Sequence, residues 1–139
     1  MHWSMIAILG ALGLIMGLLS TQGLTRGIEP YLWIILGLFS ATVVARAGHG
    51  RWFLHGLAIG VMWGVLNAIA ASALFPHYAA NNPEIMSRLD GRPAPVSPRI
   101  FFLLTGPVIG LVSGCILGLL CWCARFIIPA AGAATAKPL

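Results

Sequence analysis

Histidines are the first residues to weigh for chemistry, because imidazole nitrogens are common ligands of metals and cofactors. His55 and His77 lie near the two ends of one apolar segment. A helix of that length separates them by about 30 Å, so they cannot share a metal ion. His55 alone could serve as an axial ligand of a haem or pigment, but we favour a hydrogen-bonded histidine at the membrane interface. The histidines therefore predict no metal site and no cofactor.

The three cysteines, Cys115, Cys121 and Cys123, all belong to the last apolar segment. Cys121 and Cys123 are two positions apart, and on a helix that spacing points their side chains in different directions. The spacing fits neither a disulfide framework nor a zinc site. We expect the cysteines to be small packing residues.

Acidic residues are scarce, and their positions argue against an enzyme. The segment before the last apolar stretch offers His77, Glu84 and Asp90 without a nucleophile and base at a recognisable spacing. No Asp, Glu, Lys or Arg falls in the middle of an apolar segment, although ion-coupled carriers usually need an ionisable group there. Small multidrug exporters have a carboxylate in their first helix, and it has no counterpart between Met5 and Leu19. The glycine, arginine and phenylalanine patterns of four-helix fluoride channels are also missing.

The composition indicates what kind of protein must position these residues. Hydrophobic residues make up 59% of the 139 residues and charged residues only 8%, with a mean hydropathy of +0.94, which is too apolar for a soluble globule. The formal net charge is +5, but the Lys and Arg residues are scattered through connecting segments and form no basic face for nucleic acid. The chain is therefore predicted to be a polytopic membrane protein, with the lipid bilayer as its main partner.

Four apolar segments are long enough to cross a bilayer as helices. They predict an all-α protein with transmembrane helices at residues 3–20, 31–47, 52–75 and 99–126. No Lys or Arg precedes the first segment and no small-x-small cleavage pattern follows it, so we interpret it as a retained helix and not as a signal peptide. Residues 1–126 then form one transmembrane domain, and residues 127–139 are predicted to be a flexible tail.

The predicted extramembrane segment spans residues 77–98. Within it, Asn82, Pro83 and Glu84 have the order of a helix N-terminus, with a cap, a proline in the first turn and an acid at the positive end of the helix dipole. The pattern predicts one short helix that ends near Gly91. The prolines that follow predict an extended strap.

Small residues recur at every fourth position on two of the predicted helices. This spacing places them on one ridge of a helix, and in lipid such a ridge lets two backbones approach closely enough for dispersion to hold them together. We therefore predict glycine-rich packing faces on the third and fourth segments, at Gly56, Gly60, Gly64, Gly106, Gly110, Gly114 and Gly118.

Asn67 is the strongly polar side chain deepest in a predicted helix, and a helical wheel places it on the glycine face of the third segment. In the fourth segment Pro107 lacks an N–H group, which leaves the carbonyl oxygen of Leu103 without its helical donor. We predict that the Asn67 amide donates to this turn, either to Leu103 or to the Thr105 hydroxyl. The alternative is that Asn67 lines the path of a solute.

Lys and Arg residues usually set the orientation of a membrane protein. Four crossings divide them evenly, with Arg46, Arg51, Arg125 and Lys137 on one side and Arg26, Arg88, Arg92 and Arg99 on the other. The N-terminal amine and the absence of acids on the side of the termini favour cytoplasmic termini. The even balance also leaves open a dual topology, in which two copies insert in opposite senses.

Between residues 51 and 126 several short tracts occur in the same order as in a known group of proteins. They are His55-Gly56, Asn67, Tyr78 to Glu84, Ser97-Pro98-Arg99 and Leu103 to Pro107. In these tracts the chain resembles a group of small bacterial membrane proteins with no established activity. The resemblance implies a four-helix bacterial membrane protein and carries over no catalytic residue.

Together these patterns favour a protein that works by helix association, either as a self-assembling scaffold or as an accessory subunit of a membrane complex. The alternative is a small-solute or ion channel or carrier. We expect a location in the bacterial inner membrane, assembly as a homo-oligomer or within a larger complex, and no enzymatic activity.

Overall fold

The computed structural model describes residues 1–47, 50–90 and 96–131. In these ranges it contains six helices and no strand. The helices are α1 (Trp3–Thr21), α2 (Glu29–Ala47), α3 (Trp52–Ala73), α4 (Phe75–Asn81), α5 (Pro83–Asp90) and α6 (Pro98–Ile127). Four of them, α1, α2, α3 and α6, are long and apolar enough to cross a membrane. The predicted all-α polytopic fold is therefore confirmed.

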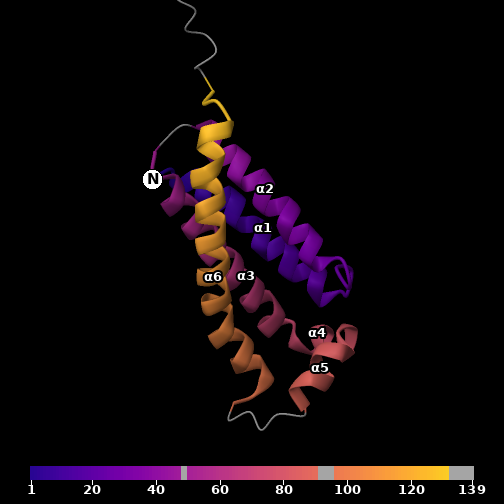
Figure 1. The fold of residues 1–139 in the computed structure, drawn as a ribbon. Helices are drawn as coiled ribbons and strands as arrows, with labels where there is room; N and C mark the ends of the chain where they lie inside the picture. Colours follow the sequence, from indigo (N-terminus) through magenta and orange to yellow (C-terminus); the bar gives the residue numbers. More distant parts are fainter. Residues whose placement is uncertain (48–49, 91–95, 132–139) are drawn as a thin grey trace, which may run out of the picture.

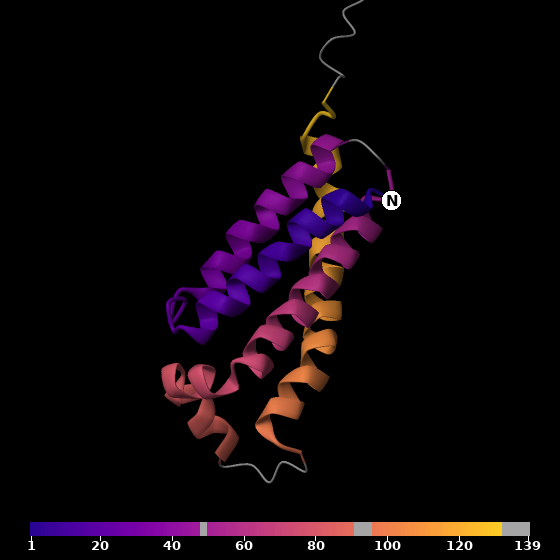
Figure 2. The same cartoon turned by 180° about the vertical axis from the view of Figure 1, so that it is seen from behind.

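Helix α3 occupies the centre of the bundle, with α6 packed on one face and α1 on another. Helix α2 lies beside α1 in both views and makes most of its contacts with α6 (Figures 1 and 2). The N-terminus and the last turns of α6 lie at one end of the bundle, and α4 and α5 lie at the other end (Figure 1). This arrangement is the one expected of four antiparallel crossings.

The contact between α3 and α6 joins two backbones through glycine. The antiparallel register places Gly56 against Gly118, Gly60 against Gly114, Gly64 against Gly110 and Ala68 against Gly106. A methyl group added to Gly56 would lie 2.6 Å from the Cα of Gly118, closer than real methyl groups approach a neighbouring backbone. We call this line of contacts, from Gly56–Gly118 to Ala68–Gly106, the seam. Beyond its Ala68 end the Ser72 hydroxyl donates to the Arg99 carbonyl over 3.2 Å. The glycines predicted as packing faces therefore meet each other within one chain.

Helix α1 approaches α3 in the same manner, which the sequence analysis did not anticipate. A methyl group on Gly17 would lie 2.8 Å from the Ala70 Cβ, and Gly13 faces the backbone of Trp63. The indole Nε1 of Trp63 donates to the Leu9 carbonyl over 2.8 Å. This bond satisfies a buried polar group that would otherwise face hydrocarbon.

The buried core lies towards the end of the bundle that holds the N-terminus. All four spanning helices contribute to it, and its members include Ile6, Val44, Ile59, Leu117 and Cys121. Of the three cysteines, only Cys121 packs inside as predicted, whereas Cys115 and Cys123 are exposed. The exposed pair corrects the prediction, because both side chains point out of the bundle.

The third crossing ends earlier than the sequence suggested. We predicted a helix to Phe75 that Pro76 would stop, but α3 ends at Ala73 and α4 begins at Phe75. Leu74 breaks the helix with φ −102° and ψ 30°. Pro76 falls in the first turn of α4, where its missing N–H removes no hydrogen bond. Helix α5 begins at Pro83, where the predicted cap pattern placed a short helix.

Two asparagines fasten α4 to the end of α1. The Asn82 side chain is buried and donates to the carbonyls of Ser20 at 3.0 Å and Tyr78 at 2.9 Å. The Asn81 side chain donates to the Thr21 carbonyl at 3.1 Å. The Ser20 carbonyl also accepts from the Gly23 N–H at 3.0 Å, so the asparagines add donors from α4 to the last carbonyls of α1.

Parts of three predictions lie outside the described residues. They are the turn at residues 48 and 49, the proline strap at residues 91–95, and residues 132–139 of the predicted tail. Ile127, the first residue of that predicted tail, still belongs to α6.

The seam predicts a sharp difference between two glycine-to-alanine changes. We expect Gly60→Ala to destabilise the protein by about 1–3 kcal/mol, because the new methyl group meets the backbone of Gly114. The matched control is Gly37→Ala in α2, where an added methyl group meets nothing within 4 Å, and where alanine's helix propensity makes the change neutral or mildly stabilising. Thermal unfolding in detergent measures both. Equal unfolding temperatures for the two variants would contradict the seam.

Candidate functional site: a groove between α2, α3 and α6

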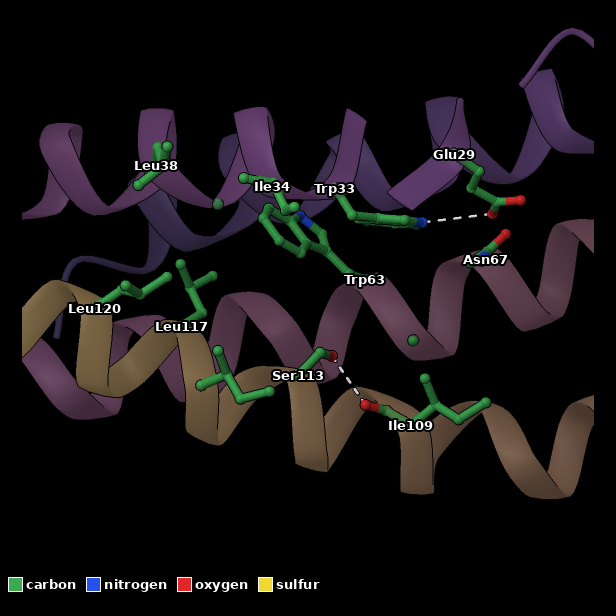
Figure 3. A pocket seen from close by; sticks show the side chains of 13 residues that line it. Glu29, Trp33, Ile34, Leu38, Trp63, Asn67, Ile109, Ser113, Leu117 and Leu120 are labelled. Atoms are coloured by element: carbon green, nitrogen blue, oxygen red, sulfur yellow. Dashed lines mark hydrogen bonds between the residues drawn. The ribbon is translucent and has the colours of Figure 1, made fainter. Parts of the chain in front are cut away.

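A groove of about 580 Å³ lies between α2, α3 and α6 (Figure 3). Helices α2 and α6 meet near the end that holds the N-terminus and diverge towards the end that holds α4 (Figures 1 and 2). Helix α3 forms the floor between them. The volume is in the range of small-molecule binding sites in proteins.

Most of the groove is apolar. Its aliphatic walls come from α2 and α6 and include Ile34, Leu38, Ile109, Ile116 and Leu120. The ring of Trp63 on the floor lies 5.3 Å from that of Trp33, with 46° between the planes. Ser113 also lines the groove, but its hydroxyl donates within α6, to the Ile109 carbonyl at 2.9 Å. The middle of the groove therefore presents carbon to any occupant.

Polar side chains gather at the end nearest α4. Glu29, the first residue of α2, lines the groove there, and the indole Nε1 of Trp33 donates to its Oε1 over 3.4 Å. Asn67 projects from α3 towards Glu29 (Figure 3). The groove thus has a carboxylate and an amide at one end and leucines at the other.

A smaller cavity of about 180 Å³ continues from this polar end. It shares Glu29 and Asn67 with the larger groove and adds Tyr78 from α4 and Phe102 from α6. The two rings meet edge to face, with centroids 5.1 Å apart. Burial raises the pKa of Tyr78 to about 12, and the negative charge of Glu29 contributes to the shift. Tyr78 therefore remains a neutral phenol beside the carboxylate at physiological pH.

Glu29 has no cation to offset its charge in the part of the chain that the structure describes. The ion pair found there joins Arg26 to Glu84, with the Nε of Arg26 2.9 Å from Oε1. That pair ties the link between α1 and α2 to α5, and neither of its members lines the groove. The Glu29 carboxylate is left with the indole hydrogen bond alone.

Asn67 does not make the hydrogen bond that we predicted for it. Among the described residues no bond joins it to Leu103 or Thr105, and the Thr105 hydroxyl donates to the Phe101 carbonyl of its own helix at 2.8 Å. Ala68, the next residue, takes the contact with Gly106. One residue turns a helix by about 100°, so Asn67 points out of the seam. It lines the groove instead.

The other predicted residues differ in whether they line one of the two cavities. Thr105 lines the smaller cavity with Asn67, although its hydroxyl is occupied within α6. Pro107 lines neither cavity, and α6 continues through it from Pro98 to Ile127. Gly64 lies in the seam and also on the groove floor.

Glu29 is the residue that the sequence analysis missed. We began the second helix at Tyr31, which left Glu29 outside it, whereas α2 begins at Glu29 and holds Pro30 in its first turn. Two signals could have found it. An acid is favoured in the first turn by the helix dipole, and Trp33 lies one turn later, close enough to bond it.

His55 is buried and bonded through both ring nitrogens. The Arg51 carbonyl lies 3.0 Å from Nδ1, and a carbonyl can only accept, so Nδ1 carries the proton. The backbone N–H of His2 donates to Nε2 over 3.0 Å. These partners leave His55 no free nitrogen for a haem or pigment. Within the described ranges no group of three or more His, Cys, Asp or Glu is placed to hold a metal ion.

The proximity of Tyr78 and Glu29 can be tested by titration. In a Tyr31→Phe background Tyr78 is the sole tyrosine, and its ionisation can be followed in the near ultraviolet. We expect a midpoint near pH 12, because burial raises the pKa of Tyr78 from the ordinary tyrosine value of 10.0 to about 12. Glu29→Gln should lower the midpoint, because a nearby negative charge disfavours tyrosinate. Glu84→Gln is the control and should lower it less. An unchanged midpoint in Glu29→Gln would show that the two groups do not interact.

Comparison with known proteins identified no similar protein. No protein-family model, curated protein or solved structure matches the chain. The chemistry of the groove is therefore inferred from its own side chains, with Glu29 and Asn67 at one end and carbon walls along the rest.

Proposed function

We propose that the groove binds a small amphipathic solute within the membrane, and that the protein is a small-solute carrier or channel component. The observation that carries this proposal is a groove of about 580 Å³ with polar groups at one end and apolar walls along the rest. Such a shape orients a molecule that has one polar end. Asn67 supports the proposal, because it faces this space and makes no hydrogen bond to another described side chain.

The packing of the glycine faces weighs against a pure scaffold. The small residues of α3 meet those of α6 within the chain, and the glycines of α1 meet α3. They are therefore not available to hold a second protein. Ala41 and Ala45 of α2 are likewise buried inside the bundle.

A second candidate function is an accessory subunit or a self-assembling scaffold. One observation favours it: the groove is flanked by large exposed apolar side chains, among them Ile34, Ile109 and Ile116. A helix from a second copy or from another protein could cover them. In that case the purified protein would migrate as a multimer or with a partner.

We also propose that the protein resides in the bacterial inner membrane with both termini in the cytoplasm. The N-terminus and the end of α6 share one end of the bundle (Figure 1). At that end the Arg125 guanidinium lies 4.8 Å from the ring centroid of Trp52 and 5.1 Å from that of Trp122, an arrangement suited to a membrane interface.

Cysteine labelling tests this orientation. In a background without the native cysteines, we expect Ala131→Cys to react with an impermeant reagent only after the cells are opened. Ser87→Cys on α5 should react in intact spheroplasts. Labelling of both positions from one side would contradict the four crossings, and labelling of each from both sides would indicate dual topology.

Filling the groove tests the proposed function. Gly37 of α2 lines the groove and has open space around it, so Gly37→Phe should block the groove without disturbing the seam. The matched control is Ile35→Phe, on an exposed position of α2 that does not line the groove. The probes are 6-phenylhexyltrimethylammonium and its uncharged carbon isostere, in which tert-butyl replaces trimethylammonium. Protein in nanodiscs is titrated calorimetrically, with empty nanodiscs as reference.

We expect saturable binding of at least one probe to the wild type and to Ile35→Phe, and a loss of about tenfold or more in affinity for Gly37→Phe. The absence of saturable binding of both probes would contradict a solute-binding groove. A multimer or a co-purified protein that covers the groove would then support the second candidate.

A further inference from the structure

The charge in the groove indicates what kind of solute it selects. Glu29 lines a space whose walls are mostly carbon and aromatic rings, with Asn67 and Ser113 as the other polar side chains. A carboxylate in such surroundings is costly unless a cation or hydrogen bonds offset its charge. Its bond from Trp33 is long, at 3.4 Å, and the described residues bring it no Lys or Arg.

No Lys or Arg among the described residues lies within ion-pair distance of Glu29, and three of the described arginines have other partners. Arg26 is paired with Glu84. Arg99 lies over the ring of Phe75, at 5.9 Å from its centroid, and Arg125 lies among aromatic rings at the opposite end of the bundle. Among the described residues, the polar end of the groove therefore holds a negative charge without a matching Lys or Arg.

We propose that the groove selects amphipathic organic cations and that Glu29 binds their cationic head. This proposal rests on the proposed function, because it names the class of solute for the same groove. The head lies between Glu29 and Asn67, and the apolar body extends along α2 and α6 towards Leu120. The charge of Glu29 excludes anions of the same shape.

The surroundings of Glu29 suit an organic cation better than a metal ion. Calcium takes six to eight oxygen ligands and magnesium six, with carboxylates prominent among them, whereas Glu29 is the single carboxylate among the residues that line the two cavities. The other side-chain oxygens there belong to Asn67, a neutral Tyr78 phenol, and the hydroxyls of Ser20, Thr105 and Ser113. The rings of Trp33 and Tyr78 border the same end, and aromatic faces attract ammonium groups. The carbon walls beyond add contact for an apolar body and none for a bare ion.

The matched probes test this inference separately from the proposed function. We expect the wild type to bind 6-phenylhexyltrimethylammonium about tenfold or more tightly than its tert-butyl isostere, the factor expected for one charged partner. Glu29→Gln keeps the acceptor for Trp33 and removes the charge, so it should abolish this preference by lowering the affinity for the cation to about that for the isostere. Glu84→Gln removes an acid outside the groove and should change the affinity for the cation by less than about twofold.

A second measurement uses the wild-type protein, in case Glu29→Gln does not fold. The cation should protect Glu29 from carbodiimide modification, as read by mass spectrometry, and the isostere should not. The inference is overturned if the two probes bind equally, or if Glu29→Gln leaves the affinity for the cation unchanged. If Gly37→Phe still blocks both probes in that case, the groove is a binding site without charge selection. A Lys or Arg of another polypeptide that cross-links to Glu29 in the purified protein would also overturn it.

Discussion

Close contact between the backbones of α3 and α6 is the constraint on which the rest of the structure depends. Lipid tails are as apolar as leucine, so helices in a bilayer gain little free energy from burying apolar side chains and must be held together by dispersion at short range. The glycines from Gly56 to Gly64 and their partners on α6 make that range possible. This contact fixes the register and depth of both helices. Helix α1 packs on a second face of α3, and α2 packs mainly on one part of α6. The groove is the space that remains where α2 departs.

The same property of lipid decides what the groove can recognise. A solute that enters from the bilayer already has apolar surroundings, so transfer to walls of isoleucine and leucine adds little free energy beyond packing. Discrimination must come from interactions that lipid tails do not offer. At the polar end those are the Glu29 carboxylate, the Asn67 amide and the aromatic faces of Trp33 and Tyr78. In the proposed function, a few polar atoms on carbon walls would therefore be sufficient for selectivity.

The sequence predicted those features that depend on local composition and spacing. Hydropathy located four spans, and the four-residue step of small residues located the seam. The features it failed to predict depend on shifts of one or two residues in a helix position or a helix boundary. Asn67 lies next to Ala68 in the chain, yet the turn of about 100° between them moves it from the seam to the groove. Pro76 can stop a helix or sit in the first turn of the next one, and Glu29 was excluded because the helix was begun after Pro30. The groove itself arises where α2 separates from α6, and no single segment encodes that.

Asn81, the last residue of α4, and Asn82, which follows it, impose an order on the folding of this protein. The carbonyls of Ser20 and Thr21 receive donors from residues about sixty positions later in the chain, with separations of 62 and 60. At synthesis rates of about 5–20 residues per second, α1 spends about 3–12 s in the membrane before these donors emerge. The donors can reach it only after α3 has crossed the bilayer and delivered α4 to the same side. The end of α1 therefore gains these two donors only when the third helix has inserted in the direction that brings α4 to it.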